Sequence, residues 1–307
     1  MDELDAAITD SVLLDNIGNL DDIIATDLLL QTPKERVAQR KICNSCKKLL
    51  CAKECFDGNL KTCRGCLRVR RTYQRRKRKQ KLEEADLENL ILQVKEKKIY
   101  GINVTVPFKK SVIPFLNELT LEAEQTHSVN TIYLKNNKVI GHNTDIGGFE
   151  MSIYKSNINL TNKKILILGA GGVVSSIIYA LKKMNVSEIT LSNRTKEKAE
   201  NLKNIFNDLN IIKWGEVSNF DMIINATSLG LNKKDEINLD YSSIHKNKIF
   251  YDVIYNPKET GFLRTGKNLG NIIINGKLMF VYQAFLAFDI WHQLKPDINE
   301  EVLKLLD

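Results

Sequence analysis

The sequence predicts an α/β protein whose C-terminal part contains a doubly wound parallel sheet. Three observations predict this class. From residue 163 onward, short apolar runs alternate with helical patterns. The first run, 164–168, passes through a glycine turn into a helical pattern over 177–181. The composition of the 307 residues, 43% hydrophobic and 27% charged, is that of a globular protein with room for two domains.

The apolar runs are short enough for strands and are separated by helical or turn-forming stretches. They recur at 164–168, 189–192, 221–225, 249–253 and 271–274. Strands that alternate with helices are typical of crossover units, which place parallel strands in one sheet with helices on its faces. We therefore expect one domain of this kind after residue 150.

Charge divides the chain into three parts. The net charge of +8 is the sum of −8 over residues 1–33, +15 over 34–81 and +1 over the remainder. The acidic head, 1–33, mixes acids with aliphatic pairs and has no aromatic residue, so it cannot bury enough apolar surface to fold alone. We expect a disordered tail. Segments of this composition can fold on a protein partner, and a purely solvated tail or a short amphipathic helix are the alternatives.

All six cysteines lie between residues 43 and 66. The first 30 residues lack the features of a signal peptide, so we expect an intracellular chain with reduced thiols. Cys43-x2-Cys46 and Cys63-x2-Cys66 have a spacing that lets four thiolates bind one Zn²⁺ tetrahedrally. This pattern predicts a zinc-finger-like module, with buried or incidental thiols as the alternative.

A basic run follows the last cysteine. Residues 67–81 hold nine Lys or Arg and no Pro, Gly or acid, which predicts a helix. Such a helix repels itself unless it lies against phosphates, so residues 64–81 are predicted to bind nucleic acid. A nuclear-localisation signal or a solvated linker fits the same residues.

The turn after the first apolar run has the composition of a dinucleotide-binding turn. In the segment 169–173 (Gly-Ala-Gly-Gly-Val), glycines let the backbone approach a pyrophosphate, and the following helix supplies N–H groups. The next strand ends at the segment 193–195 (Asn-Arg-Thr), where an acid would favour NAD and Arg194 fits a 2′-phosphate. The sequence therefore predicts an NADP site, with a surface arginine as the alternative.

A second group of polar residues lies upstream of this turn. Residues 103–109 read as a strand that ends at Lys109, and two later loops carry Asn130 and Asp145. Oxidation of an alcohol by hydride transfer needs a group that takes the hydroxyl proton. A lysine and an aspartate beside a nucleotide site are predicted to form this acid–base pair, although either residue alone would be a surface lysine or a turn aspartate.

Together these segments resemble the shikimate dehydrogenase family, from about residue 86 to the C-terminus. The matching motifs are NVTVPFK at 103–109, VNT at 129–131, NTD at 143–145, GAGG at 169–172, NRT at 193–195 and NATSLG at 225–230. The resemblance implies an oxidoreductase that reversibly reduces 3-dehydroshikimate to shikimate with NADPH, a step of chorismate and aromatic amino-acid biosynthesis.

The resemblance also implies roles for single residues. The catalytic residues would be Lys109 and Asp145. Substrate contacts would come from Thr105, Asn130, Tyr255 and Gln283. Cofactor contacts would come from Gly169, Ala170, Gly171, Gly172, Val173, Asn193, Arg194, Thr195, Thr227 and Gly276.

Two departures from the family pattern are visible. Leu278 stands where the family usually has a glycine. The family's Ser-x-Ser motif, which binds the substrate carboxylate, has no counterpart before residue 86: Ser11 stands alone, and Ser45 lies among the cysteines. We therefore expect a fusion with a junction near Glu84, where an unrelated zinc-finger-like segment replaces the start of the substrate domain.

These observations divide the chain into five expected segments. They are an acidic tail at 1–33, a cysteine-rich module with a basic helix at 34–84, a truncated substrate domain at 85–150, an NADP-binding Rossmann domain at 151–275, and C-terminal helices returning to the substrate domain at 276–307.

The expected function is that of an NADP-dependent shikimate dehydrogenase, impaired by the loss of its N-terminal substrate-binding unit. The alternative is a zinc-dependent, transcription-factor-like protein that binds nucleic acid and carries an inactive reductase fragment. The reductase part is expected in the cytoplasm, whereas the N-terminal part allows the nucleus. No apolar run approaches the roughly 20 residues that span a bilayer, so no membrane association is expected.

Overall fold

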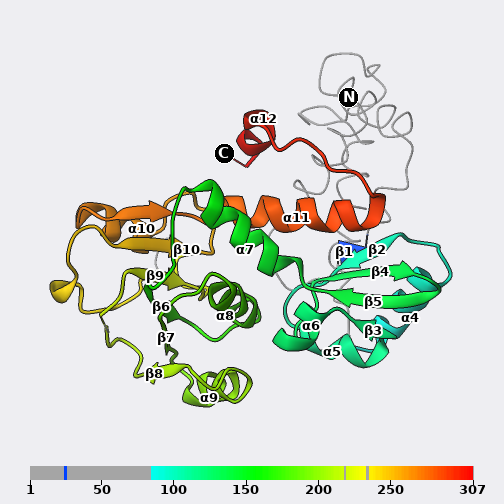
Figure 1. Ribbon diagram of the computed structural model, residues 1–307, viewed down its shortest axis with the longest axis horizontal. Helices are drawn as coiled ribbons and strands as arrows, with labels where there is room; N and C mark the ends of the chain where they lie inside the picture. Colours follow the sequence, from blue (N-terminus) through cyan, green and yellow to red (C-terminus); the bar gives the residue numbers. More distant parts are fainter. Residues whose placement is uncertain (1–23, 26–83, 218, 233–234, 307) are drawn as a thin grey trace, which may run out of the picture.

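The computed structural model describes residues 24–25, 84–217, 219–232 and 235–306. These residues form two α/β lobes joined by long helices (Figure 1). The expected zinc-finger-like module and basic helix, and nearly all of the acidic tail, lie outside the described residues. In the part of the chain that is described, no helix is both long and apolar enough to cross a bilayer.

The nucleotide lobe is built on a six-stranded sheet. Its strands are β6 (Lys164–Leu168), β7 (Glu188–Ser192), β8 (Asn210–Ile212), β9 (Met222–Asn225), β10 (Ile249–Asp252) and β11 (Ile272–Ile274). Their order is β8-β7-β6-β9-β10-β11, and every neighbouring pair is parallel. This is the order of a doubly wound Rossmann sheet, so the predicted fold class of this lobe is confirmed.

Strand β6 shows why its sequence is apolar without alternation. Ile165 and Ile167 belong to the core on one face of the sheet, which α8 (Val174–Lys183) and α9 (Lys196–Ile205) cover. Leu166 and Leu168 belong to the core on the other face, together with α10 (Gly261–Asn268). A parallel strand buried on both faces needs apolar side chains at every position.

The substrate lobe contains a five-stranded sheet of mixed direction. Its strands are β1 (Ile24–Ala25), β2 (Gly101–Asn103), β3 (Glu118–Leu119), β4 (Thr131–Lys135) and β5 (Lys138–His142), in the order β1-β2-β4-β5-β3. All neighbours are antiparallel except β3 and β5. Short helical segments connect them: α5 (Phe108–Ser111), η3 (Ile113–Phe115) and α6 (Leu121–Thr126).

Helix α4 (Glu84–Lys95) packs on this sheet through one apolar stripe. Leu87, Ile91 and Val94, spaced four and three residues apart, are buried in one cluster with Ile102 of β2 and Ile132 of β4. This spacing places all three side chains on one face of a helix. Helix α4 is therefore anchored in the hydrophobic core of the substrate lobe.

Two helices, α7 (Thr144–Lys155) and α11 (Lys277–His292), run side by side between the lobes (Figure 1). They approach closely because α7 carries glycine at the contact: a Cβ at Gly148 would lie 2.9 Å from the backbone N of Gln283. At the far end of α11, Trp291 Nε1 donates a hydrogen bond to Ile132 O of the substrate sheet (3.0 Å). A short helix, α12 (Glu300–Lys304), follows.

The prediction that residues 103–109 form one strand was wrong. Strand β2 ends at Asn103, and Lys109 lies on the short helix α5. Pro107 has no N–H to donate to a sheet ladder, and the Phe108 N–H turns back to Thr105 O (2.9 Å). The alternating Val104-Thr105-Val106 pattern therefore leads into a turn, and the turn presents the lysine.

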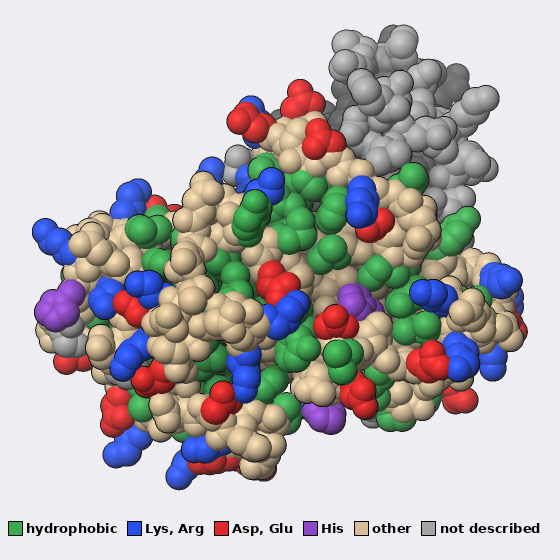
Figure 2. Space-filling view, viewed as in Figure 1, with side chains coloured by type: hydrophobic (Ala, Val, Ile, Leu, Met, Phe, Trp, Pro, Cys, Tyr) green, Lys and Arg blue, Asp and Glu red, His purple; other side chains and the backbone are tan. Residues whose placement is uncertain are grey.

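Charges of both signs are interspersed over both lobes on the face shown in Figure 2. This distribution agrees with the net charge of +1 counted for residues 82–307.

Candidate active site

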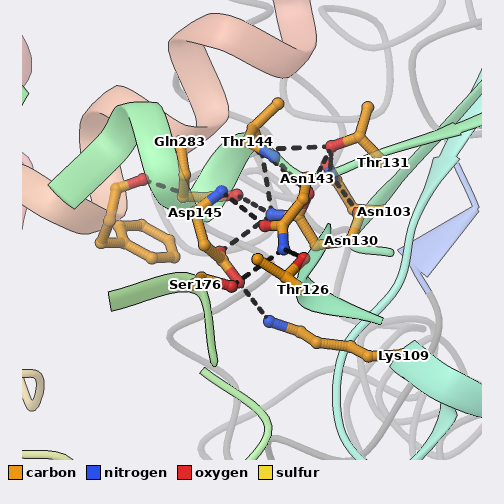
Figure 3. A network of polar contacts seen from close by, with 11 residues as sticks. Asn103, Lys109, Thr126, Asn130, Thr131, Asn143, Thr144, Asp145, Ser176 and Gln283 are labelled. Carbon is orange, nitrogen blue, oxygen red and sulfur yellow. Dashed lines mark hydrogen bonds and ion pairs between the residues drawn. The ribbon is translucent and has the colours of Figure 1, made fainter. Parts of the chain in front are cut away.

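The centre of the candidate site is an ion pair between a lysine of the substrate lobe and an aspartate of α7, one of the two helices that lie between the lobes. Lys109 Nζ lies 2.6 Å from Asp145 Oδ2, and the two side chains are only 11% and 9% exposed. Lys109 reaches up from α5, and Asp145 stands in the first turn of α7 (Figure 3). The structure thus brings together the two residues that the sequence singled out as an acid–base pair.

Asp145 is held by its backbone and by its second carboxylate oxygen. Its N–H donates to Asn143 Oδ1 (3.2 Å), because Asn143 caps the N-terminus of α7. Its Oδ1 accepts a hydrogen bond from Asn130 Nδ2 (2.9 Å). These two contacts fix the orientation of the carboxylate that pairs with Lys109.

Asn130 connects three elements around the ion pair. Its Oδ1 accepts from the Thr144 N–H (2.7 Å) and from the Thr131 hydroxyl (3.0 Å). Its Nδ2 lies 3.5 Å from Gln283 Oε1 on α11. Asn130 is 3% exposed, and these partners fix the orientation of its amide. The predicted substrate residues Asn130 and Gln283 therefore meet at the ion pair (Figure 3).

The glycine turn of the nucleotide lobe lies against this group. A Cβ built at Gly172 would stand 3.0 Å from Val106 Cγ2 and 3.8 Å from Lys109 Cδ. Thr105 belongs to the same half-buried loop before α5. The turn that was predicted to bind a cofactor and the lysine that was predicted to move a proton are therefore neighbours in space, although 60 residues separate Lys109 from Gly169.

The residues of the turn fit a dinucleotide. Gly169 has φ +110°, and a Cβ there would lie 2.8 Å from Ala226 O, so only glycine fits without a shift. Around Gly171 the space is open, with no atom nearer than 3.8 Å to a built Cβ. Ala170 and Val173 complete the turn, and α8 begins at Val174 with no acid in its first turn. Free N–H groups at a helix N-terminus suit a pyrophosphate.

The segment 193–195 follows β7 at the same edge of the sheet. Asn193 Nδ2 donates to Thr195 O (2.7 Å), which folds the segment into a turn. Arg194 and Thr195 are exposed. In this fold the residue after the second strand faces the adenosine ribose, and the segment carries a cation and no acid. These residues suit a 2′-phosphate better than free ribose hydroxyls.

A second buried network ties the ends of β9 and β10 together. Asn225 Nδ2 donates to Asp252 Oδ1 (3.0 Å), and Asn225 Oδ1 accepts from the Thr227 hydroxyl (2.7 Å). Asp252 Oδ2 accepts from the Thr260 hydroxyl (2.7 Å), and its Oδ1 accepts from the Ile254 N–H (3.0 Å). Burial raises the pKa of Asp252 to about 6. Through these hydrogen bonds the Asp252 carboxyl holds two segments in place. One is the segment after β9 that carries Thr227, and the other runs from Asp252 to Thr260.

The raised pKa predicts a specific pH dependence of stability. Between its usual pKa of 3.8 and about 6, the folded state binds more protons at Asp252 than the unfolded state. The contribution of Asp252 to the free energy of unfolding therefore falls as pH rises through this window, by at most about 3 kcal/mol. Asp252→Asn lacks this titration. Relative to wild type, the variant should gain stability in urea unfolding between about pH 4.5 and about pH 7. If the difference in the free energy of unfolding between Asp252→Asn and wild type did not change with pH, the raised pKa of Asp252 would be contradicted.

Three further predicted residues gather at the start of α11. Tyr255 stacks on Phe280, with ring centroids 4.5 Å apart. The Gly276 N–H donates to Ile254 O (3.1 Å), and a Cβ at Gly276 would lie 2.0 Å from Val253 O. Gln283 Nε2 donates to Phe280 O (3.1 Å). Close backbone contact thus explains the glycine at 276, whereas Leu278 lies half-buried in the first turn of the helix.

Sequence reasoning assigned no role to several residues of the site. Asn143, Thr126 and Ser176 form a buried chain of hydrogen bonds, and Asp252 forms the second network. Asn143 stands in the NTD motif at 143–145, whereas the only signal at Ser176 and Asp252 was a polar residue beside or within an apolar run. The predicted zinc ligands lie outside the described residues. Within the described ranges, no group of three or more His, Cys, Asp or Glu could hold a metal ion.

Two protein-family models match the chain. The shikimate dehydrogenase substrate binding domain matches residues 69–132, and shikimate / quinate 5-dehydrogenase matches residues 152–253. The shikimate dehydrogenase (NADP(+)) of Pelagibacter ubique is 56% identical over 240 residues, which cover 78% of this chain and 89% of that protein. The chain belongs to the shikimate dehydrogenase family.

Solved structures of shikimate dehydrogenases show the same fold. The enzyme from Aquifex aeolicus has a TM-score of 0.65 at 34% identity, and the alignment covers 73% of this chain and 83% of that one. A shikimate dehydrogenase in complex with NADP+ has a TM-score of 0.68 at 32% identity, with 73% and 82% covered. The Rossmann assignment and the family resemblance are thereby confirmed.

The match to the shikimate dehydrogenase substrate domain begins further upstream than expected. It starts at residue 69, inside the basic run 67–81 and before the expected junction near Glu84. The comparisons therefore place most of this run within the reductase match. They give no support to a nucleic-acid partner, to a protein partner for the acidic head, or to a fused zinc finger.

Proposed function

We propose that this chain is an NADP-dependent shikimate dehydrogenase that interconverts 3-dehydroshikimate and shikimate. The observation that carries the proposal is the buried Lys109–Asp145 pair beside the glycine turn of the nucleotide lobe, where a Cβ built at Gly172 would lie 3.8 Å from Lys109 Cδ. The Pelagibacter ubique relative named shikimate dehydrogenase (NADP(+)) supports the same substrate and cofactor.

Lys109 is the residue that handles the proton. During ketone reduction its Nζ gives a proton to the carbonyl oxygen, and in the reverse direction it takes the proton from the hydroxyl. Asp145 orients Nζ through their 2.6 Å contact and holds the substrate hydroxyl by accepting a hydrogen bond from it. Asn130, Thr105, Tyr255 and Gln283 are proposed to bind the remaining polar groups of the substrate.

NADP, when bound, supplies the chemistry of hydride transfer. The turn 169–173 would hold its pyrophosphate through backbone N–H groups, and the segment 193–195 would hold its 2′-phosphate. Thr227, which follows β9, and Gly276, which caps α11, would contact the nicotinamide part of the cofactor. The low exposure of the Lys109 and Asp145 side chains limits the access of water to the ion pair.

Arg194 should set the preference for NADP over NAD. A charge-assisted hydrogen bond contributes about 1.5–3 kcal/mol, so Arg194→Ala should raise the KM for NADPH about 10- to 100-fold and leave the KM for NADH within about 2-fold. Arg264→Ala serves as the matched control because this exposed arginine lies on α10 and pairs with Glu259. Equal KM changes for both cofactors would contradict the assignment.

The direct test of the proposed reaction is oxidation of NADPH that depends on 3-dehydroshikimate. Purified full-length chain should consume the two in equal amounts and form shikimate, identified chromatographically. NADPH oxidation without shikimate formation, or no oxidation at any substrate concentration, would contradict the proposed function.

The lack of a Ser-x-Ser motif before residue 86 should weaken substrate binding. Two hydroxyl hydrogen bonds to a carboxylate are each worth about 1.5–3 kcal/mol, so the KM for shikimate should exceed that of the Pelagibacter ubique relative at least about 100-fold. Steady-state kinetics of both proteins under one condition decide this. Equal KM values would show that other residues bind the carboxylate.

We also propose that Cys43, Cys46, Cys63 and Cys66 bind one Zn²⁺. Their two Cys-x2-Cys pairs support this ligand set. Metal analysis after dialysis tests it: close to one zinc per chain is expected, and less than about 0.3 would contradict the site.

A further inference from the structure

The buried amide of Asn143 joins the two lobes. Asn143 follows strand β5 and caps helix α7. Its Nδ2 donates one hydrogen bond to Thr126 Oγ1 (3.0 Å) and one to Ser176 Oγ (2.9 Å), as Figure 3 shows. Its Oδ1 accepts the Asp145 N–H (3.2 Å). The side chain thus touches three elements at once.

The two hydroxyl partners come from different lobes. Thr126 is the last residue of α6 in the substrate lobe, whereas Ser176 lies in the first turn of α8, the helix that begins after the glycine turn. Asn143 is 1% exposed, and both hydroxyl residues are 0% exposed. A hydrogen bond lost at such depth, with the lobes still packed, would leave a buried polar group unpaired.

The amide also has little freedom to rotate. Both N–H groups of Nδ2 are used, one toward each lobe, and Oδ1 is fixed by the helix cap. Thr126 is itself held, because its hydroxyl donates to Glu122 O (2.7 Å) and so presents a lone pair to Asn143. A shift of α8 relative to the substrate lobe would therefore pull on the residue that caps the helix of Asp145.

We infer that Asn143 is a positioning residue that fixes the cofactor helix α8 relative to Asp145. The inference rests on the proposed function, because only a reaction between a substrate at Lys109 and a cofactor at the glycine turn requires the two lobes to keep a fixed relative position. Through Asp145, the Asn143 amide keeps Lys109 Nζ at a fixed position relative to a cofactor that the glycine turn would hold. A misplacement of about 1 Å far from the reacting atoms can cost about 10²-fold in rate.

Ser176→Ala tests this inference because it removes the nucleotide-lobe acceptor and leaves the cap and the Thr126 bond in place. Losing one hydrogen bond of about 1.4 kcal/mol corresponds to about 10-fold, so kcat should fall about 10-fold while the KM for NADP+ stays within about 2-fold. Ser175→Ala is the matched control, since Ser175 is the neighbouring buried serine of α8. Its kcat should stay within about 2-fold of wild type.

Several outcomes would overturn the inference. Equal kcat values for the two serine variants would do so, and so would a loss confined to the KM for NADP+, which would indicate cofactor-helix packing alone. Thr126→Val removes the acceptor in the other lobe and should produce the same fall in kcat, which covers the case in which Ser176→Ala does not fold.

Hydrogen exchange separates this inference from the proposed function. Ser176→Ala should speed amide exchange in the first turn of α7, residues 144–147, and Ser175→Ala should not. If the wild-type chain shows no shikimate-dependent turnover, the proposed function is wrong. The amide exchange rates of the two serine variants would still show whether Asn143 fixes α8 relative to α7. Equal exchange in both variants would overturn its positioning role.

Discussion

Replacing Lys109 with methionine should lower kcat about 10²- to 10⁴-fold, the range that positioned acid–base groups contribute. Methionine fills a similar volume but cannot donate or accept the proton. The KM for shikimate should change much less than kcat, because Asn130 and Gln283 remain in place. Steady-state rates of NADP+ reduction at saturating shikimate measure the effect.

Lys110→Met is the control for this variant. Lys110 is the next residue on α5 but is exposed, so its replacement should leave kcat within about 2-fold. If Lys109→Met kept more than a tenth of the wild-type rate, or if both variants lost activity equally, Lys109 would not be the proton donor.

Asp145→Asn should reduce both activity and stability. The variant keeps the shape of the side chain but leaves the Lys109 ammonium buried without its counter-charge, a change that costs about 3–5 kcal/mol in comparable pairs. With Nζ no longer held at 2.6 Å, kcat should fall about 10²-fold. Urea unfolding and steady-state kinetics on the same preparation measure the two effects.

The exposed Asp297 offers a matched control for the aspartate variant. Asp297→Asn should change neither the free energy of unfolding by more than about 0.5 kcal/mol nor kcat by more than about 2-fold. A stable and fully active Asp145→Asn enzyme would show that the ion pair is dispensable, and the proposed mechanism would then be wrong.

The nucleotide lobe was predictable because its signal is local. The run 164–168 is apolar at four consecutive positions after Lys164, since a parallel strand is buried on both faces, and the turn 169–172 has the glycines that its backbone requires. The substrate lobe is less regular. There, Val104-Thr105-Val106 alternates like a strand, and only Pro107 marked the turn that moves Lys109 onto a helix.

The sequence predicted single residues of the candidate site, but it did not predict which of them form hydrogen bonds with one another. Lys109 and Asp145 were found because their residue types suit proton transfer. Asn143 and Ser176, 33 residues apart, meet only when the lobes pack, and no spacing in the sequence indicates this contact. Asp252 was missed for the same reason, since its partner Asn225 ends strand β9 and its partner Thr260 caps helix α10.

The role of Lys109 in shikimate oxidation is tested most directly by the rate of NADP+ reduction by the purified chain at saturating shikimate, with Lys109→Met as the blank. The wild-type chain should form NADPH in a shikimate-dependent reaction at least about 100-fold faster than the variant. A rate that is equal in the two proteins, or a wild-type rate that does not depend on shikimate, would contradict this role.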